Sequence, residues 1–139
     1  MSARAFVDSN VLVYAHDTGA GGRHRIARDL VARLWEERNG VLSTQVLQET
    51  WVNIRRKARR PVPRDEALRL IEDYSRWEVV VNGVESVAEA IRIEERYGIS
   101  FWDALIVHAA QSAGVETIYS EDLSDGQQYG AVTVVDPFS

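Results

Sequence analysis

The sequence of 139 residues contains no cysteine and no long apolar run. The absence of cysteine excludes disulfide bonds and thiolate metal sites, and it is compatible with a reducing compartment. No uninterrupted stretch of 18 apolar residues occurs, and no long apolar stretch precedes the first acid, Asp8, so neither a membrane span nor a secretory leader is predicted. We therefore expect a cytoplasmic protein without a membrane association.

Hydrophobic residues make up 45% of the chain, which is enough for a sequence of this length to bury a core without cross-links. No linker, repeat or low-complexity tract interrupts the pattern. We expect residues 1–139 to form one globular domain.

Short segments rich in β-branched residues alternate with amphipathic helical patterns. Five segments are predicted as strands: residues 5–7, 41–42, 79–81, 117–119 and 132–135. Helices are predicted between them, and the one near residue 86 is expected to start with the capping pattern Ser86-x-x-Glu89 and to bury Ala88 and Ile91. This alternation predicts an α/β fold with a mostly parallel sheet covered by helices on both faces.

Acidic residues occur where such a fold presents a ligand site. Asp8 directly follows the first strand, and Glu121 and Asp122 closely follow the strand at 117–119. Glu49 lies about one turn into the helix after the second strand, and Asp103 opens an apolar helix. Ligands of open α/β sheets gather outside the carboxyl ends of the strands. The acids are therefore expected at one edge of the sheet.

Carboxylates that meet at one edge repel one another and take up protons unless a cation neutralises them. Mg²⁺ and Mn²⁺ are hard ions that prefer oxygen ligands. The three histidines, His16, His24 and His108, lack ligand-like spacing, so a dedicated zinc site is not expected. The acids therefore predict a magnesium or manganese site that can assist hydrolysis of a phosphodiester.

The motifs that contain these acids resemble the four acidic motifs of PIN domains, in the same order along the chain. They are FVDSNVLVY at 6–14, STQVLQE at 43–49, SFWDALI at 100–106 and IYSEDLSDG at 118–126. The resemblance spans nearly the whole chain and implies a three-layer α/β/α sandwich. It also implies a metal-dependent endoribonuclease, similar to the VapC-type toxins of toxin–antitoxin pairs, that leaves a 5′-phosphate and a 3′-hydroxyl.

The same resemblance implies metal binding and catalysis by four acids: Asp8, Glu49, Asp103 and Asp122. Asn10 and Ser120 are expected to support them through hydrogen bonds. Glu121 and Asp125 lie close enough to Asp122 in the sequence to supply or share the fourth role. The resemblance further implies a Mg²⁺ or Mn²⁺ cofactor, a homodimer, and a cognate antitoxin whose tail covers the acidic cleft.

Each acid also has a purely structural interpretation. Asp8 could be a turn or cap residue, and Ser100-x-x-Asp103 has the form of a capping box at the start of a helix. Glu49 could be a solvated helix acid, and Glu121-Asp122 could belong to an ordinary polar loop. The metal-site interpretation rests on the four positions as a set.

The net charge of −5 hides one dense basic segment, which holds six of the sixteen cationic residues within positions 55–64. Five of them are predicted to bind RNA phosphates: Arg55, Arg56, Lys57, Arg59 and Arg60. A solvated helix end is the alternative interpretation of this segment. Phe101 and Trp102 could stack on bases, but their position at the start of an apolar helix favours a core role.

Two other functions use a similar chain. A phosphoacceptor signalling domain also binds Mg²⁺ with acids at strand ends, but it needs a lysine at a late strand end, and the only lysine is Lys57. A catalytically silent PIN-like binding module is the second alternative, and the intact acids argue against it.

Overall fold

The computed structural model describes residues 3–139, which form a six-stranded sheet in the order β3-β2-β1-β4-β6-β5. The strands are β1 (Ala5–Val7), β2 (Gly40–Ser43), β3 (Glu78–Val80), β4 (Thr117–Tyr119), β5 (Gln128–Tyr129) and β6 (Val132–Val135). Every pairing is parallel except that of β5 with β6. The prediction of a mostly parallel sheet is confirmed, although β3 lies one residue earlier than expected and β5 was not predicted.

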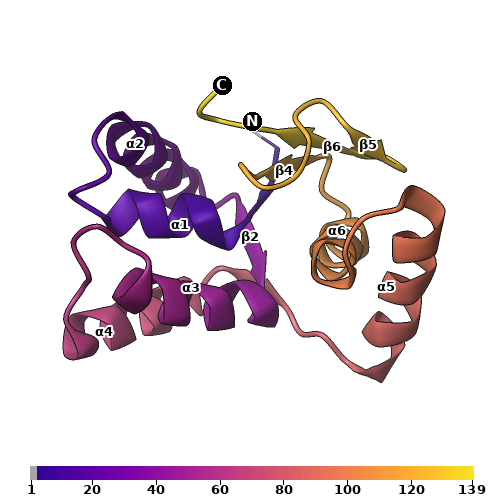
Figure 1. The fold of residues 1–139 in the computed structure, drawn as a ribbon, viewed down its shortest axis with the longest axis horizontal. Coiled ribbons are helices and arrows are strands. Elements are labelled where there is room, and N and C mark those ends of the chain that lie inside the picture. Colours follow the sequence, from indigo (N-terminus) through magenta and orange to yellow (C-terminus); the bar gives the residue numbers. More distant parts are fainter. Residues whose placement is uncertain (1–2) are drawn as a thin grey trace.

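Helices cover both faces of this sheet (Figure 1). The helices of the described residues are α1 (Ser9–His16), α2 (Gly22–Glu37), α3 (Thr44–Arg56), α4 (Arg64–Tyr74), α5 (Val84–Tyr97) and α6 (Phe101–Ala113). The first four lie on one side of the sheet, and α5 and α6 lie together on the other, so the three-layer prediction is confirmed. Within residues 3–139, none of the helices has the length and apolar character needed to cross a bilayer.

The strand order reverses next to β1. The chain moves from β1 outward to β2 and β3, and then returns to pair β4 with the other side of β1. The register pairs Val7 with Tyr119, so the next residues, Asp8 and Ser120, leave the sheet side by side. Ligands of doubly wound sheets bind at such a reversal.

Helix α1 begins directly after Asp8 and was not predicted as a helix of its own. Asp8 is its N-cap, and its Oδ1 accepts a hydrogen bond of 2.8 Å from the Ser9 backbone N–H. Val11, Leu12 and Val13 are all buried, so the segment lacks the polar face that normally reveals helical periodicity. The structural interpretation of Asp8 as a cap is therefore correct, and it does not exclude a role in the site.

Helix α5 departs from the sequence prediction at its start and on its buried face. It begins at Val84, and Ser86 sits inside the first turn, where its Oγ accepts from the Gly83 N–H at 3.0 Å. The buried residues include Ala90 and Ile93, whereas Ile91 is 49% exposed. The prediction that Ala88 and Ile91 form the buried stripe was wrong, because isoleucines at both 91 and 93 permit two alternative faces.

Candidate metal site at the carboxyl edge of the sheet

Asp8 and Ser120 form the buried centre of the acidic site. The Asp8 N–H donates to the Tyr119 carbonyl at 2.9 Å, and the Ser120 hydroxyl donates to Asp8 Oδ2 at 2.8 Å. Ser120 Oγ also accepts from the backbone N–H groups of Asp122 and Leu123, at 3.1 and 3.3 Å. One fully buried hydroxyl thus fixes both the first acid and the loop that carries Asp122.

Glu49 is held by two side chains that the sequence analysis did not identify. Its Oε1 accepts from the Ser9 hydroxyl at 3.1 Å, and its Oε2 accepts from Gln45 Nε2 at 3.3 Å. The same Gln45 amide donates to the Trp102 carbonyl at 3.2 Å, which ties α3 to the first turn of α6. Gln45 precedes Glu49 by four residues, and this helical spacing is the signal that could have revealed it.

Asp103 lies in the first turn of α6 and is half-buried. The Ser100 Oγ accepts from the Asp103 N–H at 3.1 Å, so the sequence pattern is a true helix cap. The Asp103 carboxylate also interacts with Ser100, and the charge of Asp122 acts on it. Trp102 is 63% exposed, so the expected core role of this residue is wrong.

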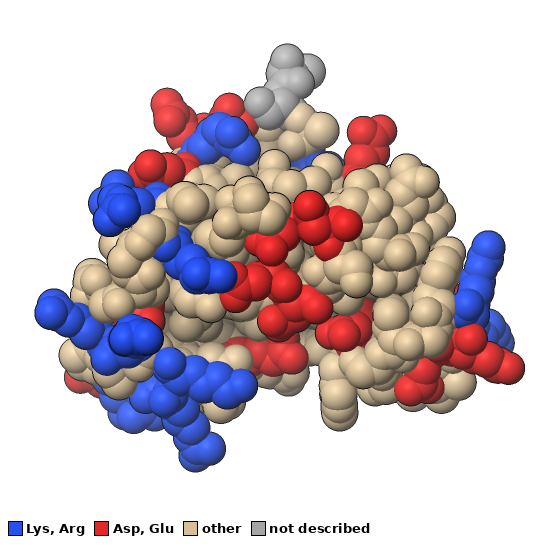
Figure 2. Space-filling view, turned by 45° about the horizontal axis from the view of Figure 1, so that its top comes forward, with Lys and Arg blue, Asp and Glu red and all other residues tan. Residues whose placement is uncertain are grey.

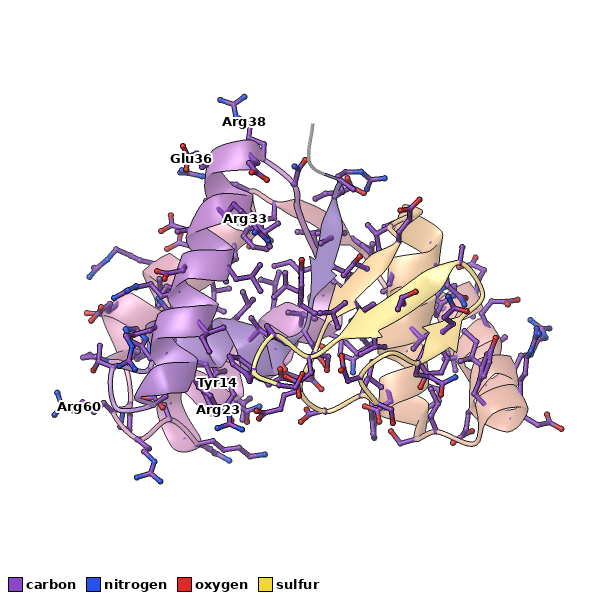
Figure 3. The ribbon with its side chains drawn as sticks, turned by 90° about the horizontal axis from the view of Figure 1, so that it is seen from above. Tyr14, Arg23, Arg33, Glu36, Arg38 and Arg60 are labelled. Carbon is purple, nitrogen blue, oxygen red and sulfur yellow. The ribbon has the colours of Figure 1, made fainter. Side chains whose placement is uncertain are left out.

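The two neighbouring acids after β4 face different partners. The Asn10 side chain joins them, since its Nδ2 donates to Asp122 Oδ2 and its Oδ1 accepts from the Glu121 N–H, both at 3.1 Å. The Glu121 carboxylate accepts from the Tyr14 hydroxyl at 2.9 Å and from Arg23 Nε at 2.6 Å. Figure 3 shows Tyr14 and Arg23 together at one end of α2. Both Glu121 oxygens are thus engaged by α1 and α2, which favours Asp122 as the fourth acid.

Arg23 is itself held in place by aromatic rings. Its guanidinium carbon lies 5.8 Å from the centre of the Tyr14 ring and 5.6 Å from that of Phe138. Tyr14 and Phe138 meet edge to face at 5.1 Å. No local pattern in the sequence could reveal the contact between Arg23 and Glu121, because these two residues are 98 positions apart.

The acids influence each other's protonation. Burial raises the pKa of Asp8 from 3.8 to about 7, hydrogen bonds from Ser120 and Ser9 oppose this, and the charges of Glu49 and Asp122 raise it further. Burial also raises the pKa of Asp103, against the hydrogen bond with Ser100, and the charge of Asp122 adds to the rise. The folded chain therefore keeps negative charge at this edge at a cost that a cation would relieve.

This cost predicts a pH-dependent difference between the metal-free protein and its Asp8→Asn variant. In the unfolded chain Asp8 loses its proton near its ordinary pKa of 3.8, but in the folded chain it keeps the proton up to about pH 7. Folding is therefore penalised increasingly between these two values. We expect the variant to gain stability over the wild type as the pH rises from about 4 to 7. At pH values above 7, the difference in the free energy of unfolding should be a few kcal/mol.

Thermal melts in a chelating buffer at pH 5, 6, 7 and 8 measure this difference. Comparison with the variant cancels groups that titrate in both proteins, such as His16, whose pKa burial lowers. A constant difference between the two proteins across the four pH values would show that the Asp8 carboxylate is not destabilised by burial.

The donor set fits a hard divalent cation. The four carboxylates come from four segments of the chain. Asp8 is only 4% exposed, whereas Asp122 is exposed, so the acids extend from the protein interior to the solvent. Within residues 3–139, no three acidic or histidine side chains lie close enough together to form a preformed metal-binding site. The oxygen donors and their mutual repulsion suit Mg²⁺ or Mn²⁺, which also retain water ligands.

A hollow of about 210 Å³ connects the acidic edge with the basic segment. Its lining includes Asn10, Asp122, Asn53 and Lys57, so side chains of α1, the loop after β4 and the end of α3 share one cavity. Figure 2 shows acidic side chains across the middle of one face and a group of basic side chains beside them. A polyanion bound at the basic group would therefore reach the acids.

Asp17 shapes the loop that carries Arg59 and Arg60. Burial raises the pKa of Asp17, but hydrogen bonds from the N–H groups of Arg59, Arg60 and Gly19 outweigh it and hold this pKa below its ordinary value. A Cβ at Gly19 would lie 2.8 Å from the Arg59 Cβ, so this close approach requires glycine. Arg60 points away from the body of the molecule (Figure 3).

Structural comparison relates the chain to known toxins at low sequence identity. VapC20 of Mycobacterium tuberculosis, a toxin that cleaves the sarcin-ricin loop, is 22% identical with a TM-score of 0.63, over 85% of this chain and 89% of that one. A toxin–antitoxin complex from Klebsiella pneumoniae gives 18% identity and a TM-score of 0.69, over 96% and 97%. DNA-bound VapBC from Salmonella typhimurium gives 15% and 0.67, over 98% and 99%. These similarities establish a shared fold.

Sequence comparison gives the family. A search among curated proteins found no match. The sequence profile of the PIN domain matches residues 5–124, a range that contains all four acids. The chain therefore belongs to the PIN domain family.

Proposed function

We propose that this protein is an endoribonuclease that hydrolyses RNA at the four-acid edge of its sheet, and that it is the toxin of a type II toxin–antitoxin pair. The observation that carries the proposal is the interaction of the acids near the strand reversal, where the charges of Glu49 and Asp122 act on Asp8 and the charge of Asp122 acts on Asp103. Family membership and the fold shared with VapC toxins support it.

The chain's own residues have distinct roles in this proposal. Asp8, Glu49, Asp103 and Asp122 would hold Mg²⁺ or Mn²⁺, and such an ion would neutralise the carboxylates and stabilise negative charge on the phosphodiester. Ser120 holds Asp8, Ser9 and Gln45 hold Glu49, and Asn10 holds Asp122. These hydrogen bonds fix the orientation of the oxygen donors before RNA binds, which lowers the reorganisation needed for reaction.

Removal and return of the metal tests the activity directly. Purified protein is expected to cut an unstructured RNA in Mg²⁺ or Mn²⁺, to lose that activity in excess chelator, and to regain it when the ion is restored in excess. Robust cleavage in chelator would contradict the metal-dependent mechanism. Metal binding without any cleavage would favour a PIN-like binding module instead.

The basic segment is proposed to bind the RNA backbone. Arg55 and Arg56 occupy the last turn of α3, and Lys57 is its C-cap. Replacing Arg55, Arg56 and Arg59 together by glutamine is expected to weaken RNA binding and to reduce the slope of log affinity against log salt, by roughly 0.7 for each lost phosphate contact. A salt series of binding isotherms measures the slope, and an unchanged slope would identify these cations as a solvated helix end.

We further propose a cognate antitoxin and a homodimer as the assembled state. The first is supported by the toxin–antitoxin complexes among the proteins of similar fold. The second follows from the family resemblance of the motifs. Light scattering of the purified chain tests the dimer, and co-purification with the product of a neighbouring antitoxin gene tests the complex.

A further inference from the structure

The outer surface of α3, the helix that also carries Glu49, has a second hollow. It has a volume of about 340 Å³ and is lined by Trp51, Val52, Arg55 and Arg56. The Arg55 guanidinium carbon lies 5.0 Å from the centre of the Trp51 ring. The hollow therefore combines a flat aromatic ring, a stacked guanidinium and an apolar side chain that is 45% exposed.

The Trp51 ring is supported from behind. It is half-buried and packs against a small core cluster: Val13, Ile54, Ala58, Val62 and Ala67. A ring fixed in this way loses little freedom when another flat group stacks on it. The hollow thus has a rigid aromatic side.

Helix geometry places one side of this hollow on the strip of α3 that carries Glu49. Val52 and Arg56 follow Glu49 by three and seven residues, so all three lie along one strip of α3. At the rise of an α-helix, the step from Glu49 to Arg56 is about 10 Å. Trp51 and Arg55 follow Glu49 by two and six residues and lie further around the helix, so an RNA strand with a phosphate at the acids reaches the ring by crossing this strip.

The charge around the hollow selects the kind of occupant. Within residues 3–139, none of the five basic side chains predicted to bind RNA pairs with a carboxylate: Arg55, Arg56, Lys57, Arg59 and Arg60. Unneutralised cations around an aromatic ring suit a polyanion with flat bases, and both tryptophan and arginine planes stack on unpaired bases.

We infer that this hollow is a base-stacking subsite in which one unpaired base, on the same strand as the cleaved phosphodiester and a short distance along it, stacks on the Trp51–Arg55 pair. The inference rests on the proposed ribonuclease function and extends it, since it defines the substrate as RNA that is single-stranded near the cut. The Arg56 and Lys57 side chains then contact the flanking phosphates.

Binding of a labelled unstructured RNA in chelating buffer tests the subsite without cleavage. Trp51→Ala is expected to weaken binding by roughly tenfold, as for the loss of one stacked base. Trp51→Phe is expected to lose less, and Trp35→Phe, which alters a partly exposed tryptophan outside the hollow, is expected to lose nothing. The salt slope should stay at the wild-type value in Trp51→Ala, because the cations are intact.

RNA that carries a single abasic position, moved along the strand, provides a second measurement. When the abasic position falls in the subsite, the wild type is expected to bind that RNA about as weakly as Trp51→Ala binds the intact RNA. Trp51→Ala should bind the abasic and the intact RNA with the same affinity. Quenching of tryptophan fluorescence by RNA in the wild type, but less in Trp51→Phe, supports the stacking even if the alanine variant folds poorly.

The outcomes separate the subsite from the proposed function. A wild type that binds and cleaves RNA, together with a folded Trp51→Ala variant of equal RNA affinity, overturns the subsite alone and leaves the hollow to a protein partner. A wild type that neither binds nor cleaves RNA overturns both.

Discussion

Asp8→Asn is expected to abolish RNA cleavage, with a loss on the order of a thousandfold or more, while the protein stays folded. The amide has the shape of the carboxylate and can still accept from the Ser9 N–H through its single oxygen, while its NH2 group takes the position that faces the Ser120 hydroxyl. It lacks the negative charge, which the other acids cannot replace, because Asp8 is the most buried of the four. Initial rates at saturating Mg²⁺ measure the effect.

Asp29→Asn is a matched control for this variant. Asp29 is an exposed acid on α2 that pairs only with its neighbour Arg28 among the described residues, so cleavage should be unchanged. The metal-free Asp8→Asn protein should also melt at a higher temperature than the wild type at pH 8. Loss of cleavage together with a lower melting temperature would point to misfolding and would not support a role of Asp8 in the chemistry.

Asp122→Asn and Glu121→Gln are expected to differ sharply, although the two acids are adjacent. Loss of the Asp122 charge should lower cleavage roughly 100-fold, because this carboxylate is coupled to both Asp8 and Asp103. Loss of the Glu121 charge should cost at most about tenfold, since Glu121 contacts Tyr14 and Arg23 and positions the loop from outside.

The concentration of Mn²⁺ that gives half-maximal cleavage separates these two roles. Asp122→Asn is expected to need much more Mn²⁺, and Glu121→Gln is expected to keep a value near that of the wild type. Arg23→Lys provides a further comparison, because it keeps the charge beside Glu121 but not the planar donor at Nε. If Glu121→Gln were the variant with the larger Mn²⁺ requirement, the fourth acid would be Glu121.

The sequence predicts the fold well because most of its strands and helices carry their own local signal. The segments at 117–119 and 132–135 coincide with β4 and β6, since β-branched residues flanked by turns are typical of buried parallel strands. Helix α1 escaped prediction because burial on most of its sides removes the polar face. The two-residue strand β5 is too short to produce any periodicity.

The candidate site was predicted in part. Asp8 could be located from its position after a strand. Glu49 could be located only from its motif and from the presence of the other three acids in the sequence. The contacts that orient these acids join distant segments, such as Ser9 with Glu49 and Gln45 with Trp102, which are 40 and 57 positions apart. No local pattern encodes such pairs, because they depend on how α1, α3 and α6 meet in the folded chain.

The chemical identity of the RNA ends tests the central claim most directly. RNA fragments produced by the wild type in Mg²⁺ should carry a 5′-phosphate and a 3′-hydroxyl, and sequencing methods that ligate only such ends should recover them. The same reaction in chelator, or with Asp8→Asn, should yield none above background. Fragments that end in a cyclic phosphate, or equal cleavage by Asp8→Asn, would contradict hydrolysis by the four-acid site.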